Sequence, residues 1–535
     1  MRCINLFNVQ KISLYLKSFI MSSMPCLKSL LLLLTLCLVY LQLQSQEFVY
    51  FNNRYDPTGN LLADRAYGII KTENGYVLCA NIANGYWYTA LLSLDYDGSF
   101  NNIKMYGDGY SEFIVGRAGS LMKYDDQTYY TVGFNRVYTS TWVHDQGLLM
   151  CYNNTMDTLW SHYYGERNEP YDTAFIFSQI NKTSHGDLII TGGWMPYGLP
   201  SHMYLLKTDK YGNKQWDNSF GFSTWYYLGY SVIQTSDGGY AIGGGRFVIG
   251  DINSGAPIVI KTDSAGNQQW FKNLGGPYVD DIAMVCPSED DNILVGTVYT
   301  DYMTGDDPHS RINIVKLDIQ GNIVWNKKYG STRIGNYLLN IRCLSSGDIL
   351  SCGFVYDIFP HIAGWMLKIN NDGDSLWYRE YDILAGSESM NNFYDILETS
   401  DNGIIACGYI HPVSPDSGTE DVWVIKVDSL GCEGPDDCWV GMEEKPEEEM
   451  TGKALEIYPN PAGRRLRVAG YGLRGDEYAV VSFFDSYGHK VFEMTVPPSQ
   501  KEIFVDVSAW HDGLYAVMLL QNGKIAGSGK VVVMR

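Results

Sequence analysis

The sequence predicts an all-β chain, a seven-bladed β-propeller followed by a small C-terminal β-sandwich. Three observations support this fold class. Short apolar runs alternate with Gly-, Asn- and Asp-rich turns along most of the 535 residues, which is typical of antiparallel sheets. A unit of about 55 residues occurs seven times between residues 47 and 432. From residue 455 onward the repeat gives way to short alternating strands, which predict a separate domain.

The repeat is clearest in two columns of residues, one of tryptophans and one of small residues. The tryptophans are spaced by 52 to 56 residues and the small residues by 52 to 59. Each unit has four short runs joined by tight turns, which predicts a four-stranded meander rather than helices. Seven such sheets closed into a ring leave only short, protected edges. The columns are Trp160, Trp216, Trp270, Trp325 and Trp377, and Ala80, Gly133, Gly192, Gly244, Gly296, Gly353 and Gly408.

The seventh unit lacks its last strand. Its third run ends at Asp428, and no tryptophan strand follows. Residues 47–55, EFVYFNNRY, resemble in residue pattern the outer strands of other units, such as WNKKYGS at 325–331. We therefore expect residues 47–55 to complete the seventh blade and to close a propeller that spans residues 46–438.

The stretch KTDSAGNQQW at 261–270 has near-copies in other units, so it is either a reactive site or a building unit. Asp263 can accept backbone N–H groups across a turn, and Gly266 supplies a positive φ. Trp270 offers a large face for packing between blades. The stem of Lys261 can cover apolar surface while its charge stays in water. Because a unique active site would not recur in nearly every blade, we interpret the stretch as structural.

The cysteines also fit structural roles. Three of them directly precede the small column, where a compact buried side chain is expected, because free Cys behaves as a small hydrophobe. Cys343 shares a hairpin with one of these three, but the turn register does not place the two opposite each other. Two further cysteines, in the segment GCEGPDDC, have the spacing for a small disulfide in an oxidising compartment. The three are Cys79, Cys352 and Cys407, and the predicted pair is Cys432 and Cys438.

The N-terminus predicts an export signal over residues 1–45. Lys28 precedes an apolar run, 30–41, which is too short for a comfortable membrane span but right for a signal-peptide core. We expect cleavage after Ser45, and Met21 or Met24 is an alternative start. No other stretch has the length and apolarity of a membrane span.

The net charge bears on the choice of partner. Residues 1–45 contain four basic and no acidic side chains, which leaves 35 basic against 60 acidic residues in the rest. This acidity, without a basic stripe, argues against a nucleic-acid partner and fits a soluble protein outside the cell.

The connections between the second and third strands are long and differ from unit to unit, whereas the other turns within each unit are short. Because variation concentrates on one face of a rigid ring, we expect binding there. The aromatic side chains in these loops suit stacking on sugars or contact with a protein. The predicted binding residues are Tyr138, Trp142, Trp194, Tyr197, Tyr299, Tyr302 and Phe359.

Metal sites are not predicted. Five of the nine histidines lie in the same loops, but a ring of loops spreads its residues too far apart for one shared ion. Asp-rich turns at 95–98 and 370–374 have the composition of calcium loops without the full twelve-residue spacing, so calcium stays an open alternative. The histidines are His144, His202, His309, His361 and His411.

Three function classes remain compatible with the sequence: a binding or adhesion module, a secreted glycan hydrolase or lyase, and a structural surface component without a ligand. A hydrolase needs two carboxyl groups at a defined separation beside a pocket. The loops contain several acidic residues and nothing that selects a pair, so the catalytic residues are unknown. These candidates are Asp306, Asp307, Asp416, Glu420 and Asp421.

An acidic linker, 439–454, separates the propeller from residues 455–535, for which a β-sandwich is expected. LEIYPNPAGRRLRV at 455–468 and DGLYAVMLLQNGKIAGSGKVVVMR at 512–535 strongly resemble the type A sorting domain of the type IX secretion system of Bacteroidota. The matching residues are Tyr458, Pro459, Asn460 and Pro461, then Gly513, Leu514 and Tyr515, then Gly529 and Lys530.

This resemblance implies passage through the outer membrane and recognition of the C-terminal domain by the translocon. It often also implies removal of that domain, with attachment of the remainder to surface lipopolysaccharide. The protein is therefore expected to be secreted or held at the outer-membrane surface. The repeat region is similar, more loosely, to propeller-like cargo that precedes such domains, and this similarity brings no activity with it.

Overall fold

The computed structural model of the chain describes residues 48–435 and 453–534, apart from short gaps. The gaps are 60–61, 139–142, 166–172, 197, 222–224, 249–250, 277, 279, 281, 305–306, 357–361, 385–388, 414–417, 470–477, 486–489, 498–499, 501 and 522–523. The chain forms two compact units that divide between residues 439 and 440. The predicted signal, 1–45, and the linker up to residue 452 lie outside the described residues.

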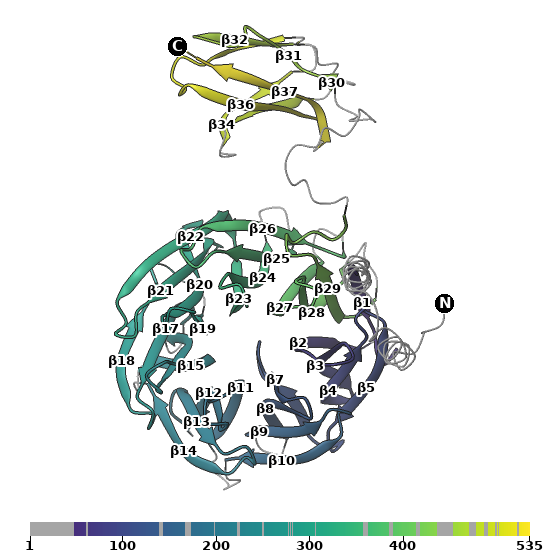
Figure 1. The fold of residues 1–535 in the computed structure, drawn as a ribbon, viewed down its shortest axis with the longest axis vertical. Helices are drawn as coiled ribbons and strands as arrows, with labels where there is room; N and C mark the ends of the chain where they lie inside the picture. Colours follow the sequence, from purple (N-terminus) through teal and green to yellow (C-terminus); the bar gives the residue numbers. More distant parts are fainter. Residues whose placement is uncertain are drawn as a thin grey trace, which may run out of the picture. The chain divides into compact units, whose positions relative to one another are not determined.

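The first unit is a β-propeller, so the prediction of an all-β chain with a propeller is confirmed. Its described strands form six hydrogen-bonded sheets arranged around a ring (Figure 1). The eight-stranded sheet consists of two antiparallel groups that are joined by one parallel pair, Ile362 with Met390. We call each antiparallel group of four or five strands a blade. Blade 1 contains β2(Asp64–Lys71), β3(Tyr76–Asn84), β4(Tyr86–Leu94) and β5(Phe100–Tyr106). Blade 2 contains β6(Glu112–Val115), β7(Leu121–Asp125), β8(Thr128–Tyr138), β9(Val143–Asn153) and β10(Thr158–Tyr164). Blade 3 contains β11(Ala174–Lys182), β12(Leu188–Met195), β13(His202–Thr208) and β14(Lys214–Phe220).

The remaining blades follow the same order, with the first strand nearest the centre of the ring (Figure 1). Blade 4 contains β15(Trp225–Gln234), β16(Tyr240–Val248), β17(Asp251–Thr262) and β18(Gln268–Asn273). Blade 5 contains β19(Met284–Pro287), β20(Ile293–Thr304), β21(Asp307–Leu317) and β22(Ile323–Ile334). Blade 6 contains β23(Asn336–Cys343), β24(Ile349–Tyr356), β25(Ile362–Ile369) and β26(Ser375–Tyr381). Blade 7 contains β27(Met390–Glu398), β28(Ile404–His411), β29(Asp421–Val427) and the N-terminal strand β1(Phe51–Tyr55).

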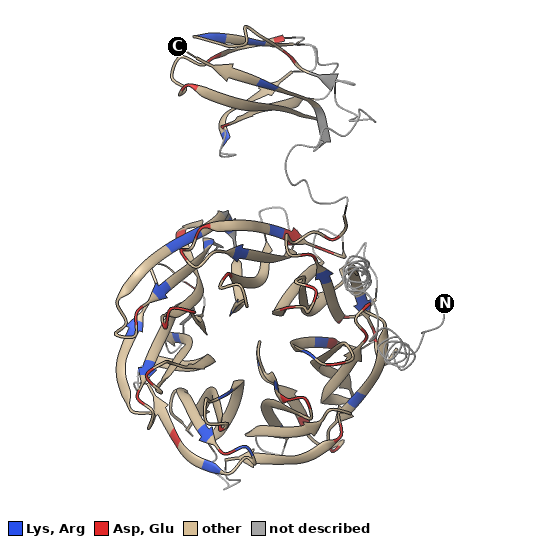
Figure 2. Cartoon of the chain, viewed as in Figure 1, with Lys and Arg blue, Asp and Glu red and all other residues tan. Residues whose placement is uncertain are grey.

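The antiparallel order of the strands gives the ring two different faces. The turns between the first and second strands and between the third and fourth strands lie on one side, for example 235–239 and 263–267 in blade 4; we call this side the turn face. The connections between the second and third strands, such as Gly85 in blade 1, and the links between blades lie on the other side, the loop face. In Figure 2 the positions of basic and acidic residues are interspersed along the strands and turns of the ring.

The N-terminal strand occupies the outer position of blade 7. It pairs antiparallel with β29, from Phe51 opposite Lys426 to Tyr55 opposite Val422. The Phe51 ring lies against Gly98 in the next blade, where a Cβ atom would come within 2.7 Å of it. The Tyr55 hydroxyl donates a hydrogen bond to the Gly98 carbonyl at 2.6 Å. Residues that are distant in the sequence therefore close the ring.

The repeated tryptophans pack between adjacent blades, as the sequence predicts. Trp270 in β18 lies over Gly321 of blade 5, where a Cβ atom would come within 3.1 Å of the indole. Its Nε1 donates to the Ile319 carbonyl at 3.0 Å. Glycine is therefore needed in the turn for close approach as well as for its positive φ of 84°. The equivalent pairs are Trp160 with Gly212, Trp216 with Gly266, Trp325 with Gly373, and Trp377 with Gly431.

The expectation for the repeated lysine is wrong. The Lys261 side chain is fully buried, and its Nζ donates to both carboxylate oxygens of Asp237 at 3.0 and 2.8 Å. It also donates to the Thr262 carbonyl and to Gln269 Oε1. These acceptors replace water, so the charge does not need to reach solvent. Corresponding pairs occur in four other blades: Lys207 with Asp187, Lys316 with Asp290, Lys368 with Asp348, and Lys426 with Asp401.

The cysteine positions agree with the structural interpretation. Cys79, Cys352 and Cys407 are fully buried. Burial raises the pKa of the Cys79 thiol to about 12, so this thiol stays protonated and is a poor nucleophile. In the β23–β24 hairpin Cys343 pairs with Ile349 rather than with Cys352. Cys432 is disulfide-bonded, and its predicted partner, Cys438, lies outside the described residues.

The second unit consists of two small sheets that share one core. Leu466 and Ile503 from one sheet and Val481 and Val517 from the other are all buried in this core. The larger sheet contains β30(Lys453–Ala454), β37(Lys524–Val533), β36(Gly513–Gln521), β33(Ala479–Phe484) and β34(Lys490–Val496), and the smaller contains β31(Glu456–Tyr458), β32(Arg465–Ala469) and β35(Glu502–Asp506). Among the described residues of both units, no helix has the length and apolarity to span a membrane.

Candidate functional site

Four of the seven predicted aromatic binding residues are described, and they belong to three blades. Tyr138 ends β8, Trp194 lies near the end of β12, and Tyr299 and Tyr302 lie in β20. Trp142, Tyr197 and Phe359 are outside the described residues. Within the described part of the loop face, no ring contact joins two of these side chains from different blades.

The four described rings differ in how much surface they offer. Tyr138 is 50% exposed and Tyr302 is 48% exposed. Tyr302 stacks on His309, with ring centroids 4.4 Å apart and an interplanar angle of 13°. By contrast, Trp194 is half-buried, and the Lys328 Nζ covers the Tyr299 ring at 3.2 Å from its centroid. Only the Tyr138 and Tyr302 rings of this described set therefore present large open faces.

The loop histidines do not form a shared metal site in the described part of the chain. His144, His202, His309 and His411 lie in four different blades, and His361 is outside the described residues. Burial lowers the pKa of His202. His411 Nδ1 lies 2.6 Å from Glu420 Oε1, which makes it an ion-pair partner when protonated.

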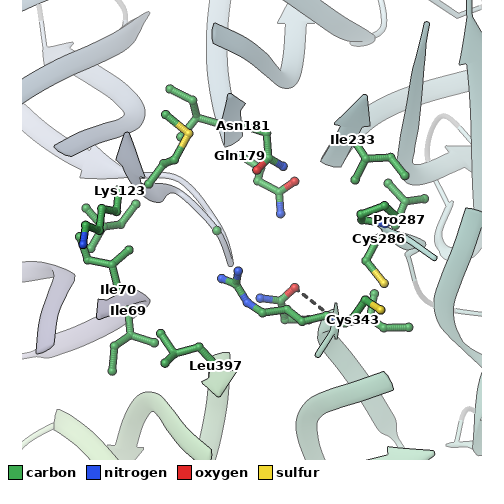
Figure 3. A pocket seen from close by; sticks show the side chains of 18 of the residues that line it. Ile69, Ile70, Lys123, Gln179, Asn181, Ile233, Cys286, Pro287, Cys343 and Leu397 are labelled. Atoms are coloured by element: carbon green, nitrogen blue, oxygen red, sulfur yellow. Dashed lines mark hydrogen bonds between the residues drawn. The ribbon is translucent and has the colours of Figure 1, made fainter. Parts of the chain in front are cut away.

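The inner strands of the seven blades enclose a central pocket of about 490 Å³ (Figure 3). It is lined by residues at the C-terminal ends of these strands, so it lies toward the turn face. This is the face opposite to the one on which the sequence predicts binding. One lining residue from each blade in turn is Ile70, Lys123, Asn181, Ile233, Cys286, Arg342 and Glu398.

At the pocket, an ion pair between the partly exposed Arg342 and Asp395, together with the hydrogen bonds of Asp395, joins three blades. The Arg342 Nη2 lies 2.7 Å from Asp395 Oδ1, and Asp395 is fully buried. Asn340 Nδ2 donates to the same oxygen at 2.6 Å, and the Ile69 N–H of blade 1 donates to Asp395 Oδ2 at 3.0 Å. Because these structural hydrogen bonds occupy both of its oxygens, Asp395 is not a free acid or base for catalysis.

The described pocket lining contains one carboxylate, Glu398. It accepts a hydrogen bond from Ser345 Oγ at 2.6 Å. The loop acids selected from the sequence lie elsewhere: Glu420 pairs with Arg65, and Asp421 with Arg54. The side chain of Asp307 is not described, and Asp306 and Asp416 are outside the described residues. The described pocket therefore lacks the pair of carboxyl groups that glycoside hydrolysis requires.

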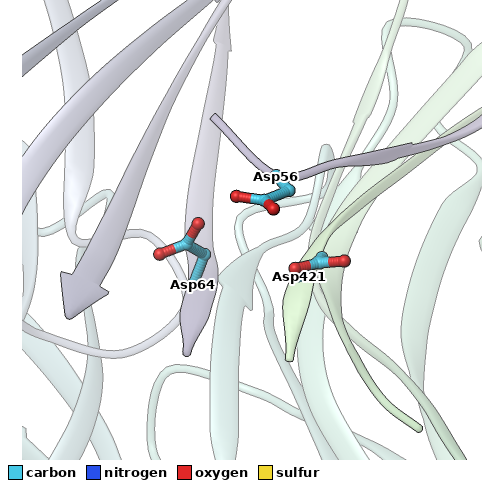
Figure 4. Close-up of side chains that lie close together, drawn as sticks. All are labelled: Asp56, Asp64 and Asp421. Carbon is cyan, nitrogen blue, oxygen red and sulfur yellow. The ribbon is translucent and has the colours of Figure 1, made fainter. Parts of the chain in front are cut away.

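Three aspartates meet on the loop face where the ring closes (Figure 4). Asp56 directly follows β1, Asp64 begins β2, and Asp421 begins β29. Carboxylate oxygens from the three side chains lie within 4.8 Å of one another. Burial and the charges of Asp56 and Asp421 together raise the pKa of Asp64 to about 7. Of the three, the sequence singled out only Asp421, because ring closure alone brings the other two beside it.

The Asp-rich turns considered for calcium use their side chains within the turn or in ion pairs. Asp97 Oδ1 accepts the Ser99 N–H at 2.9 Å. Asn370 Oδ1 accepts the Asp374 N–H at 2.7 Å, and Asp374 pairs with Lys327. Among the described residues, neither turn contributes to a cluster of acidic side chains that could hold an ion.

The predicted sorting motif of the second unit has buried and exposed parts. Asn460 Oδ1 accepts the Val532 N–H at 2.8 Å, and its Nδ2 donates to the Lys530 carbonyl at 3.1 Å. Tyr515 is buried, and its hydroxyl donates to the His511 carbonyl at 2.8 Å. Tyr458 is 75% exposed and Leu514 is also exposed. The peptide bonds that precede Pro459 and Pro461 are cis.

A comparison with protein families identifies this second unit. Residues 456–534 match the secretion system C-terminal sorting domain. The resemblance found in the sequence is therefore confirmed, and the chain is a cargo that this domain directs for export and secretion or surface display. The domain also implies contact with the type IX secretion machinery. No curated protein matches the chain.

Three solved structures that resemble the chain are distant from it in sequence. An α-L-arabinofuranosidase from Fusarium graminearum is 9% identical over 71% of this chain and 97% of that chain, with a TM-score of 0.37. A sialidase from Trypanosoma rangeli is 10% identical over 92% and 89%, with a TM-score of 0.36. A protein of unknown function from Dyadobacter fermentans is 12% identical over 57% and 92%, with a TM-score of 0.33. Likenesses this weak carry no inference about activity.

Proposed function

We propose that the protein is a secreted or surface-held binding module that takes up a glycan or a protein segment without converting it. The observation that supports binding is the central pocket, whose volume of about 490 Å³ falls in the range of ligand sites. Its described lining offers one carboxylate, Glu398, rather than a catalytic pair.

The chemistry of the pocket fits a polar ligand with apolar faces, such as a sugar. Ile70, Ile233 and Leu397 supply apolar surface, while Asn181 and Lys71 supply polar groups. The exposed Lys71 lies at the end of β2, toward the turn face. A ligand that enters from the turn face meets these side chains first.

The loop face is a second candidate surface for the same function. The exposed Tyr302 ring, held flat against His309, is a platform on which a sugar or an aromatic side chain can stack. Tyr138 adds a second exposed ring, and its hydroxyl donates to Glu112 Oε2 at 2.8 Å. These two rings lie in different blades, so they fit an extended ligand better than a small one.

Binding of the full secreted chain to glycan arrays and to soluble saccharides tests this proposal. If the ligand binds in the central pocket, Lys71→Glu should weaken binding. If it binds on the loop face, Tyr302→Ala should weaken binding. Lys214→Glu, on an outer strand, and Tyr110→Ala, an exposed tyrosine between blades, are the matched controls.

Each result has a definite reading. Loss of binding only in Lys71→Glu places the ligand in the central pocket, and loss only in Tyr302→Ala places it on the loop face. Release of reducing sugar ends would show that the protein hydrolyses the glycan, which would overturn the proposal of binding without conversion. A wild-type protein that binds no glycan and no protein would favour a structural surface component.

A further inference from the structure

The three aspartates at the ring closure have the geometry of a site for one metal ion. Their carboxylate oxygens lie within 4.8 Å of one another. Calcium–oxygen distances are about 2.3–2.6 Å, so two ligands on opposite sides of one ion are separated by about 5 Å at most. A single ion can therefore contact Asp56, Asp64 and Asp421 without rearrangement of the backbone.

Asp64 supplies an independent indication that something is bound there. It is fully buried, and neither of its carboxylate oxygens accepts a hydrogen bond. The nearby Ala83 N–H already donates to the Ala63 carbonyl at 3.0 Å. An isolated buried carboxylate is costly unless a cation or hydrogen-bond donors compensate its charge. Figure 4 shows the Asp64 carboxylate facing that of Asp56, so its own neighbours add to this cost.

Another buried aspartate shows how the chain treats such a group when no ion is needed. Asp280 is also buried, and burial raises its pKa. It accepts N–H groups from Gly276 and Thr300. Among the described residues, the one backbone donor that acts on the Asp64 carboxylate is the Ala83 N–H, which is shared with the Ala63 carbonyl. The surroundings of Asp64 are also richer in negative charge than those of Asp280.

The balance of charge at the cluster calls for a divalent cation. The Arg54 guanidinium donates to Asp421 and compensates that carboxylate. Within the described residues, neither Asp56 nor Asp64 has an ion pair. When both are ionised, Asp56 and Asp64 carry two negative charges, and one divalent ion neutralises them. His and Cys are absent from the described cluster, which disfavours zinc.

We propose that Asp56, Asp64 and Asp421 bind one Ca²⁺ ion, which fastens the closing strand β1 to blades 1 and 7. Calcium fits because it takes six to eight oxygen ligands in flexible geometry, whereas Mg²⁺ demands a near-ideal octahedron. Backbone carbonyls and water supply the other ligands. This site is separate from the Asp-rich turns and from the proposed ligand sites, so it does not depend on the proposed function.

Calcium binding should hold the closing strand β1 in place. β1 pairs with β29 over five residues, and Asp56 follows it immediately. An ion that binds both Asp56 and Asp64 links the C-terminal end of β1 to the first residue of β2 in blade 1. Because the ion binds only the closed ring, it shifts the equilibrium between the closed and open ring toward closure.

Calcium titration of the full secreted chain, stripped with a chelator, tests this site. We expect about one Ca²⁺ per chain by isothermal titration calorimetry, with a dissociation constant of about 10⁻⁴–10⁻³ M, as in extracellular modules. The melting temperature of the propeller should rise by about 2 °C or more at saturating calcium. Asp64→Asn and Asp56→Asn should each abolish both effects. The second variant changes a surface residue, so it keeps the test valid even if the first misfolds.

Asp280→Asn is the matched control, because it alters a buried aspartate outside the cluster and should leave the calcium response unchanged. The assignment would be overturned if about 10 mM Ca²⁺ produced neither heat nor a thermal shift in the wild-type chain. It would also be overturned if both cluster variants kept the full response, or if Mg²⁺ gave the larger shift.

Discussion

Lys261 Nζ lies 2.8 Å from Asp237 Oδ2, with the lysine side chain fully buried and the aspartate side chain 39% exposed. The pair joins the third strand of blade 4 to the turn between its first and second strands. The same arrangement recurs in blades 3, 5, 6 and 7. Lys261, for which the sequence predicts a solvated charge, is therefore a buried residue that links two parts of the same blade.

The first prediction compares the loss of the aspartate with the loss of the lysine from this pair. Asp237→Ala leaves a buried ammonium group with only the Thr262 carbonyl and Gln269 Oε1 as acceptors. We expect it to lower the free energy of unfolding by about 2 kcal/mol, less than for a wholly buried pair because Asp237 is partly exposed. Lys261→Met removes the charge itself and should cost less. Urea unfolding monitored by tryptophan fluorescence measures both.

Asp374→Ala is the control for that comparison. Asp374 pairs with Lys327, but the Asp374 side chain is 69% exposed and that of Lys327 is 36% exposed, so the expected cost is below about 1 kcal/mol. A cost for Asp237→Ala no larger than that of Asp374→Ala would show that the burial of Lys261 has no energetic weight.

The second prediction is a pH dependence from the equivalent pair in blade 5. Burial alone would raise the pKa of Asp290, but the hydrogen bond and charge of Lys316 lower it to about 2. The folded-state pKa is thus below the unfolded value of about 3.9. The pair therefore stabilises the fold above pH 4, and this contribution is lost as the pH falls from 4 toward 2. In Asp290→Asn, the midpoint of urea unfolding should fall less between pH 4 and pH 2 than it does in the wild type. A fall as large as in the wild type would contradict a stabilising role for the Asp290–Lys316 pair.

The third prediction concerns ring closure. Phe51→Ala removes the ring that lies against Gly98, and we expect a loss of about 2 kcal/mol. Tyr55→Phe removes the hydrogen bond to the Gly98 carbonyl and should cost about 1 kcal/mol. Deletion of residues 48–55 should lower the melting temperature more than either substitution. Tyr110→Ala, at a site 83% exposed, should leave it unchanged. A deletion variant that melts like the wild type would disprove closure by β1.

The blades were predictable from the sequence because their signals are local. The step from Asp263 to Gly266 and the following Trp270 lie within eight residues, and each position makes the contact that its chemistry suggests. The closing strand was predictable for a related reason: the absence of one strand at residue 428 matched the presence of one at 51–55.

The sites were less predictable because their signals are not local. Asp56 and Asp421 are 365 positions apart, and no spacing rule joins them. Lys261 and Asp237 are 24 positions apart, with the strand β16 between them. The aspartate in TSDGG and the lysine nevertheless recur together in several blades, and this recurrence was a usable signal. The central pocket lies toward the turn face, where the connections are short and uniform, so loop variation pointed to the other face.

The last prediction concerns the sorting domain. Deletion of residues 455–535 should leave the propeller in the periplasm, because the machinery has lost the domain that it recognises. Cell fractionation with an antibody against the propeller measures this, and normal surface display of the truncated chain would refute the sorting assignment.

Within the motif, the structure separates recognition from folding. Asn460→Ala removes two hydrogen bonds to the strand β37 and should destabilise the domain by about 2 kcal/mol, so that export falls because the domain is less folded. Tyr458→Ala changes a side chain that is 75% exposed, so the melting temperature should stay the same. If the secretion machinery reads the exposed part of the motif, Tyr458→Ala lowers export while the domain remains folded. Export at the wild-type level in Tyr458→Ala would place recognition elsewhere on the domain.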